Sequence, residues 1–168
     1  MDSHQGARGE KAKEIYSEFL NILRENTGKV NEVTGASTTF KYLREHDVHV
    51  VASTGFPAEI AEAIIEHLCW QRNGLIDGWV CSEHVGASRP DPAMIIHSMK
   101  KYNVSNSTTV IKVDDTMKGI EEGLNAGAYT IGVLTGTQSI QQLSSAEPNT
   151  ILRSVAEIPE HLVEKKMI

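Results

Sequence analysis

Apolar side chains recur with a helical period in four segments of the chain, and each segment predicts an amphipathic helix. The segments are residues 10–24, 36–45, 57–68 and 92–102. A further helix is expected after Thr116, with Ile120 and Leu124 four residues apart and its end at residues 125–127. Pro57 fits the first turn of the third helix, because the N–H that proline lacks would find no helical partner there. We also expect a short helix within residues 136–145 and a closing helix over 158–165.

Short apolar runs lie between these helices and predict buried strands. They cover residues 49–52, a short strand with an irregular loop in 75–81, and residues 110–113, 129–134 and 149–152. Strands that alternate with helices in this way imply a parallel α/β sheet with right-handed crossovers.

Two adjacent carboxylates, Asp114 and Asp115, follow the third of these strands directly. In open α/β sheets, ligands bind at the carboxyl ends of the strands. Paired carboxylates repel each other unless a cation or a proton lies between them, and Mg²⁺ prefers such hard oxygen ligands. The pattern therefore predicts a magnesium site. The alternative is that both acids are solvated loop residues or helix caps.

Two more loops after predicted strands carry polar residues. Ser53-Thr54-Gly55 offers two hydroxyl groups ahead of a helix N-terminus, and the loop of residues 82–90 offers the positive charge of Arg89. Hydroxyl groups, a cation and a magnesium site are what phosphoryl transfer requires. Taken singly, Ser53 could only cap its helix and Arg89 could only pair with a surface acid.

Length and charge narrow the class of protein. The 168 residues fit one domain, and the net charge of −6 is spread along the chain, which argues against nucleic-acid binding. No stretch approaches the ~20 apolar residues of a membrane helix. The polar opening lacks an apolar signal core, so we expect a disordered start and a cytoplasmic protein. Cys69 and Cys81 are expected to be free, buried thiols rather than a disulfide.

These loops carry a resemblance. VVASTGFP, VGASRPDPAMI and VIKVDDTMKGIEEGLNAGAYTIGVLTG resemble the second, third and fourth motifs of the haloacid dehalogenase superfamily of hydrolases, in the branch that contains phosphonoacetaldehyde hydrolase. The resemblance implies a Rossmann-like three-layer sandwich with a mainly parallel sheet. It runs from about residue 30 to the end. We therefore expect residues 31–168 to form the core, and residues 1–30 to be a polar tail with the remnant of a cap-type helix.

The resemblance also implies roles for residues. Ser53, Thr54 and Gly55 would bind the phosphoryl group, Arg89 would stabilise its charge, and Asp114 with Asp115 would hold Mg²⁺; Arg89 and Asp115 are the implied catalytic residues. Many members carry a further acid four residues past the position of Asp115, where this chain has Gly119.

The larger departure is the nucleophile. Members of the superfamily begin with an apolar strand that ends in an aspartate, and nothing before Ser53 matches it, since neither Asp2 nor Asp47 follows an apolar run. In the family's sheet this strand lies between those bearing the second and fourth motifs. Its absence leaves two facing edges unpaired, and each unmade buried hydrogen bond costs about 1–3 kcal/mol. Either the flanking strands pair directly or something else fills the interval.

Two functions follow as hypotheses, and a third explanation is that the sequence is a truncated fragment whose upstream segment holds the nucleophile. The first is a Mg²⁺-dependent hydrolase domain of the phosphatase or phosphonatase type, acting on a small phosphorylated or phosphonate substrate, with feeble or absent turnover because the nucleophile is missing. The second is a non-catalytic binding or regulatory module on the same scaffold, which forms homodimers through the exposed strand edges. The sequence does not identify the substrate.

Overall fold

Five short strands form two parallel sheets in the computed structural model, which describes residues 3–168, with side chains from residue 10 onward. The strands are β1 (Val51–Thr54), β2 (Gly78–Cys81), β3 (Ile111–Asp114), β4 (Tyr129–Val133) and β5 (Thr150–Leu152). One sheet has the order β1-β2 and the other β3-β4-β5, and every pairing is parallel.

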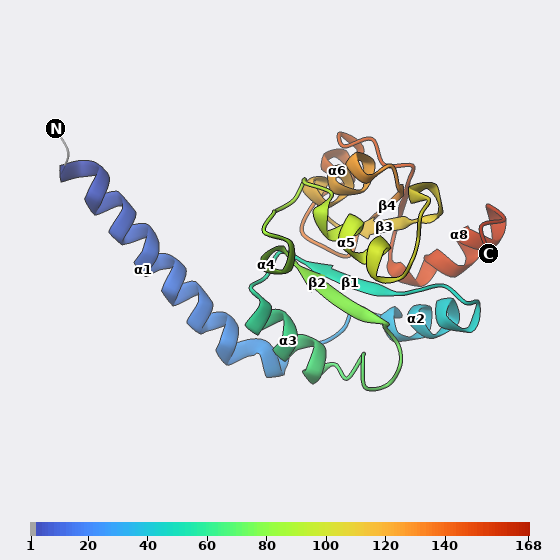
Figure 1. Cartoon of the computed structure of the whole chain (residues 1–168), viewed down its shortest axis with the longest axis horizontal. Coiled ribbons are helices and arrows are strands. Elements are labelled where there is room, and N and C mark those ends of the chain that lie inside the picture. Colours follow the sequence, from blue (N-terminus) through green and yellow to red (C-terminus); the bar gives the residue numbers. More distant parts are fainter. Residues whose placement is uncertain (1–2) are drawn as a thin grey trace.

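Helices cover both faces of the strands. They are α1 (Ser3–Asn26), α2 (Ala36–Glu45), α3 (Ala58–His67), α4 (Ser82–Val85), α5 (Ala93–Lys101), α6 (Met117–Ala126), α7 (Ile140–Ser144) and α8 (Ile158–Glu164). Three 3₁₀ turns complete the order: η1 (Thr27–Lys29), η2 (Ser107–Thr109) and η3 (Val155–Glu157). Figure 1 shows α2 and α3 on one side of the strands and α5 and α6 on the other, while α1 extends away from the body. The chain is therefore a three-layer α/β sandwich, as the sequence predicts.

Leu43 of α2 joins the two main apolar clusters. One cluster centres on Ile131 of β4 and Leu162 of α8, and the other on Val50 and Ile65 of α3; Leu43 packs against both. A single helix thus links the β1-β2 sheet to the β3-β4-β5 sheet on one face. None of the described helices is long and apolar enough to cross a membrane.

The structure differs from the sequence-based expectations in three main places. The first strand begins at Val51 rather than at residue 49, because the carboxylate of Asp77 accepts a hydrogen bond from the backbone N–H of Val50 at 2.8 Å, while the N–H of Asp77 bonds the carbonyl of Val50. The loop of residues 82–90 contains the short helix α4. The polar opening is helical from Ser3, so the expected disorder is wrong there. Asp2 lies outside the described residues.

No strand precedes β1 among residues 3–50, and β1 is not paired with β3. The flanking strands have therefore not closed up through backbone hydrogen bonds. What lies between them at their carboxyl ends is a set of polar side chains. Both cysteines are free, as predicted; Cys81 is buried, whereas Cys69 is only half-buried, so its expected burial is wrong.

Candidate functional site

Five side chains from the two sheets, one loop and α6 form a connected cluster, here called the polar network. Its members are Ser53, Arg89, Lys112, Asp114 and Glu122. Two positive and two negative charges lie in it, so its formal charge is zero. The network joins the carboxyl end of β1 to that of β3.

Arg89 is the centre of the polar network. Its Nε lies 3.1 Å from Oε2 of Glu122, and its Nη1 lies 3.2 Å from Oδ2 of Asp114. Its Nη2 donates to the backbone carbonyl and to Oγ of Ser53, at 3.0 and 3.2 Å. All three guanidinium nitrogens thus bind the chain itself, in the forked geometry that suits arginine.

Lys112, like Arg89, connects β3 to β1 across the gap between these two strands. Its Nζ donates to Oγ of Ser53 at 2.9 Å and lies 2.9 Å from Oε2 of Glu122 and 3.2 Å from Oδ2 of Asp114. The side chain is almost fully buried, as are both carboxylates. Because a buried charge without a partner is costly, these groups stabilise the fold only as a set.

The sequence of β3 and α6 makes room for these side chains. Lys112 and Asp114 are two residues apart on a strand and so point to the same face, which α6 covers. Gly119 and Gly123 are four apart on the helix. A Cβ at Gly119 would overlap the carboxylate of Asp114, and one at Gly123 would lie 2.7 Å from Cβ of Lys112. Two residues of strand and four of helix both rise about 6 Å, so each glycine lies opposite one polar side chain.

Asp114 is ionised within the network. Burial by itself raises the pKa of this carboxyl, but the charges of Lys112 and Arg89 and the hydrogen bonds from Thr116 outweigh it, so the pKa lies below its ordinary value. Oδ1 accepts from the backbone N–H of Thr116 at 3.0 Å and from its hydroxyl at 2.7 Å. The hydroxyl of Thr116 also accepts from the N–H of Gly119, which caps α6.

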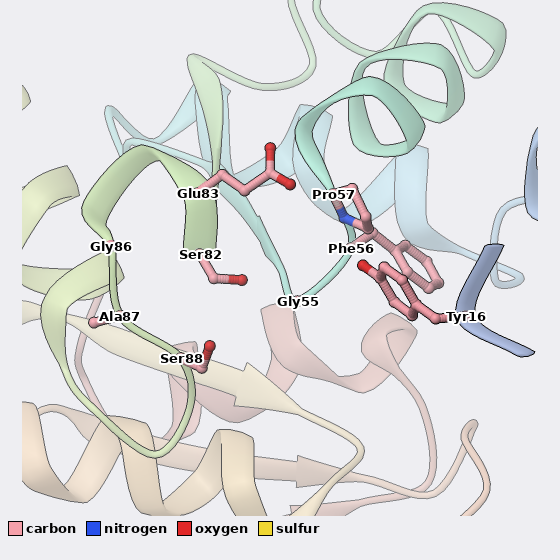
Figure 2. A pocket seen from close by; sticks show the side chains of 9 residues that line it. All are labelled: Tyr16, Gly55, Phe56, Pro57, Ser82, Glu83, Gly86, Ala87 and Ser88. Carbon is pink, nitrogen blue, oxygen red and sulfur yellow. The ribbon is translucent and has the colours of Figure 1, made fainter. Parts of the chain in front are cut away.

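The remaining predicted phosphate-binding residues lie beside the network. Oγ1 of Thr54 accepts a hydrogen bond from the backbone N–H of Phe56 at 3.1 Å, which is a local turn contact. Gly55 lines a pocket of about 390 Å³ at the carboxyl ends of β1 and β2. Figure 2 shows the hydroxyl groups of Ser82 and Ser88 in this pocket, with Tyr16 of α1 on its far side.

The two predicted magnesium ligands have different surroundings. Both oxygens of Asp114 are engaged by Arg89, Lys112 and Thr116, so Asp114 does not fit a metal ligand in this arrangement. The carboxylate of Asp115 lies where a side chain on Gly136 would project. No ion pair or hydrogen bond ties it to another described residue. Asp115 therefore fits a Mg²⁺ ligand, since that ion often takes one protein carboxylate and several waters.

The described residues contain no group of three acidic, histidine or cysteine side chains that could hold a metal ion. The magnesium site thus stays a prediction that rests on Asp115.

Arg89 contacts both Ser53 and Asp114, so side chains from three separate segments of the chain meet at Arg89. Asp115, which was expected at the same site, makes no hydrogen bond or ion pair with these described residues. Sequence reasoning missed Lys112 and Glu122. Lys112 could have been recognised from the sequence. It interrupts an apolar run, and it lies two residues before Asp114, so both side chains point to the same face of the strand. Glu122 carries none, because it follows Glu121 and looks like an ordinary charge on the solvent side of a helix.

A family model and curated relatives agree on the family to which the chain is similar. A family model described as "Haloacid dehalogenase-like hydrolase" matches residues 3–133. Phosphonoacetaldehyde hydrolase from Bordetella pertussis is 33% identical over 122 residues, which are 71% of this chain and 44% of that protein.

Solved structures share the fold. A phosphonoacetaldehyde hydrolase-like protein from Oleispira antarctica superposes with a TM-score of 0.78 at 22% identity, over 94% of this chain and 66% of that one. A hydrolase from Deinococcus radiodurans, solved with bound phosphate and sodium, gives 0.76 at 19% identity, over 86% and 65%. The chain spans about half the length of the curated relatives it matches.

Proposed function

The chain belongs to the haloacid dehalogenase-like hydrolase family, in its phosphonatase-like branch, and we propose that it binds a small phosphorylated or phosphonate compound at the carboxyl rim of its strands. One observation carries the proposal. Arg89 contacts Ser53 on one sheet and Asp114 on the other, so the three rim segments meet at one place. An anion at this rim would lie beside hydroxyl groups, backbone N–H groups and a guanidinium.

Each residue has a role in this proposal. Ser53, Thr54 and Gly55 bind the oxygens of the anion at the end of β1, beside the pocket of Figure 2. Arg89 supplies the positive charge, and Asp115 holds Mg²⁺, which when bound neutralises charge on the transferred group. A cytoplasmic setting, predicted from the sequence, belongs to the same proposal.

Turnover is expected to be feeble or absent in this chain. Among the described residues, Asp114 is the aspartate that ends a strand, and Arg89 and Lys112 hold it in ion pairs, while its neighbour Asp115 is assigned to Mg²⁺ in this proposal. A carboxylate whose charge is taken up in ion pairs is a poor nucleophile. Asp47 lies in the turn after α2, on the surface.

Calorimetry with inorganic phosphate and a generic aryl phosphate assay test the proposal together. We expect phosphate to bind more tightly with Mg²⁺ present, and Asp115→Ala to remove the effect of Mg²⁺. Asp47→Ala, an exposed control, keeps it. Absence of phosphate binding by the unaltered chain refutes the proposed site. Robust turnover that Asp115→Ala abolishes would show instead that the chain is an active hydrolase.

A non-catalytic binding or regulatory module is the second candidate. The polar network favours it, because Arg89 and Lys112 are already neutralised by Asp114 and Glu122 and so offer little net charge to a substrate. Sedimentation over a range of concentrations examines the homodimer that this candidate includes. Association that rises with concentration, without turnover, supports the module; a monomer that binds phosphate supports the first candidate.

A further inference from the structure

The pocket of Figure 2 adjoins the proposed anion site through two segments of the chain. Gly55, which lines the pocket, follows Ser53 by two residues. Ser88, which also lines it, directly precedes Arg89. Two residues of chain span at most about 7 Å, so the pocket begins next to both groups to which we assign anion binding. A compound held at Ser53 and Arg89 would therefore extend into a pocket of about 390 Å³, a volume typical of small-molecule sites.

The charge in this pocket is negative. Among the described residues that line it, Glu83 of α4 alone carries a charge. Its Oε2 accepts a hydrogen bond from the backbone N–H of Ala58 at 3.1 Å, at the start of α3. No other hydrogen bond and no ion pair joins this exposed side chain to a described residue, so Oε1 is available to a ligand. A phosphoryl group would be repelled here, whereas a cation would be attracted.

Aromatic rings lie on the same side of the pocket. Phe56 and Tyr16 both line it, and they are 38% and 55% exposed. Figure 2 shows the carboxylate of Glu83 directed toward the loop of Phe56 and Pro57, with the ring of Tyr16 beyond. The face of an aromatic ring attracts an organic ammonium group. A carboxylate beside two rings thus favours a ligand that is both cationic and partly apolar.

A metal ion fits this pocket less well than an organic cation does. Aromatic rings are not ligands for hard metal ions, which prefer several oxygen atoms. The described residues contain no group of three acidic, histidine or cysteine side chains that could hold a metal. The single carboxylate of Glu83 would leave such an ion mostly to water, whereas an ammonium group gains from both the charge and the rings.

We propose that this pocket binds an ammonium group at one end of a compound whose phosphoryl or phosphonyl group lies at Ser53 and Arg89. The substrate class is therefore a short zwitterionic phosphate ester or phosphonate, with a few carbon atoms between its two charges. Glu83 selects the cation, and Phe56 and Tyr16 contact it. The inference rests on the proposed function, since it assigns the other end of the same compound.

Calorimetry with two matched esters, in the presence of Mg²⁺, tests the inference. The probes are phosphocholine and neohexyl phosphate, which has the same shape but carries a carbon atom in place of the charged nitrogen. We expect the unaltered chain to bind phosphocholine about tenfold more tightly. Both probes share the phosphoryl end, so the ratio of their affinities reports the ammonium group alone.

Glu83→Gln separates the charge of Glu83 from its contact with α3. The amide oxygen of glutamine can still accept the N–H of Ala58, but the negative charge is gone, so the ratio should fall to about one. Glu66→Gln is the matched control, because it removes the same charge from an exposed position near the other end of α3, and it should retain the ratio. Phe56→Leu, which keeps an apolar side chain without a ring, should lower the ratio severalfold.

Choline without phosphate distinguishes failure of this inference from failure of the proposed function. Saturation transfer from the protein to the methyl protons of choline should be seen with the unaltered chain and lost in Glu83→Gln, while neohexanol shows little transfer. If this holds but inorganic phosphate does not bind, the ammonium pocket stands and the phosphate site fails.

Three results would overturn the ammonium pocket. They are equal affinities for the two esters in a chain that binds inorganic phosphate, a preference for phosphocholine that survives Glu83→Gln, and absence of transfer to choline in a chain that binds neither ester. The first of these leaves the proposed phosphate site intact. The measurements on the unaltered chain stand even if a variant does not fold.

Discussion

Asp114 and Gly119 form a matched pair at the scale of single residues. The carboxylate on the strand occupies the space that any side chain at position 119 would need. Many members of the family have an acid at that helix position, and here the carboxylate reaches the same region from the end of β3. From there it contacts Arg89 and Lys112. The sequence shows that position 119 is a glycine rather than an acid. That the Asp114 carboxylate occupies the space beside it could not be predicted, because this depends on how α6 packs on β3.

Gly119→Ala tests this pairing. We expect it to destabilise the protein by about 1–3 kcal/mol, because the added Cβ forces the Asp114 carboxylate away from its cations. Urea unfolding gives the free energy of unfolding. The double variant with Asp114→Gly should lose less than the sum of the two single losses.

Gly28→Ala is the control, because a Cβ there meets nothing within 4 Å. Equal losses at Gly28 and Gly119, or strict additivity of the double variant, would contradict the pairing.

The lowered pKa of Asp114 predicts a dependence of stability on pH. Its unfolded pKa is about 3.9, and its folded pKa is lower because Lys112 and Arg89 favour the charged form despite burial. The ionised group therefore stabilises the fold fully above the unfolded pKa, and this contribution is lost as pH falls through the folded value. Asp114→Asn removes the charge at nearly constant shape.

The difference in unfolding free energy between the unaltered chain and Asp114→Asn should be largest near pH 7 and should shrink below about pH 4. Unfolding curves at several pH values measure it. A difference that stays constant down to pH 3 would mean that the carboxylate gains nothing from its cations.

At the scale of elements, most of the order of helices and strands could be predicted from the sequence. The helical period over residues 36–45 and 57–68, and the short apolar runs, are local signals. The start of β1 is harder to predict from the sequence, because the backbone N–H of Val50 bonds the side chain of Asp77, which is distant in the chain. The full length of α1 was missed because its polar opening has no apolar period.

Helix α1 is held to the body mainly at its end. Arg24 forms a forked ion pair with Glu59 of α3, at 2.8 and 3.0 Å, while Ile15 and Tyr16 remain 63% and 55% exposed. A helix with so little tertiary packing opens readily. We expect the amides of residues 12–20 to exchange at least a hundredfold faster than those of β4, in hydrogen exchange of the unaltered chain.

Exchange in α1 as slow as in β4 would show that another surface packs against α1. Lowering the protein concentration then distinguishes contact with a second copy from contact within one chain.

At the scale of the whole molecule, two kinds of interaction join the two sheets. Leu43 connects the apolar clusters on one face, and the polar network connects the strands on the other. The apolar link could be expected from the pattern of α2. The polar link could be predicted only in part, because Ser53 and Arg89 were expected at the rim, whereas Glu122 required knowledge of how α6 sits on β3.

Leu43→Ala should therefore weaken the connection between the sheets. We expect a loss of about 2 kcal/mol and a broader urea transition, because each cluster loses a shared side chain and the two halves unfold less cooperatively. Val163→Ala, at a position that is 51% exposed, is the control and should change little. A sharp transition with an unchanged slope would show that the polar network alone keeps the halves together.

The glycine spacing of α6 also limits how the molecule can move. If α6 slid along β3 by one residue, a Cβ would replace a glycine above Asp114 or Lys112, where there is no room for it. Gliding of this helix is therefore blocked, and shear between the two layers with it. If the proposed anion binds, we therefore expect the accompanying adjustment in the segments that carry Ser53 and Arg89 rather than between α6 and β3.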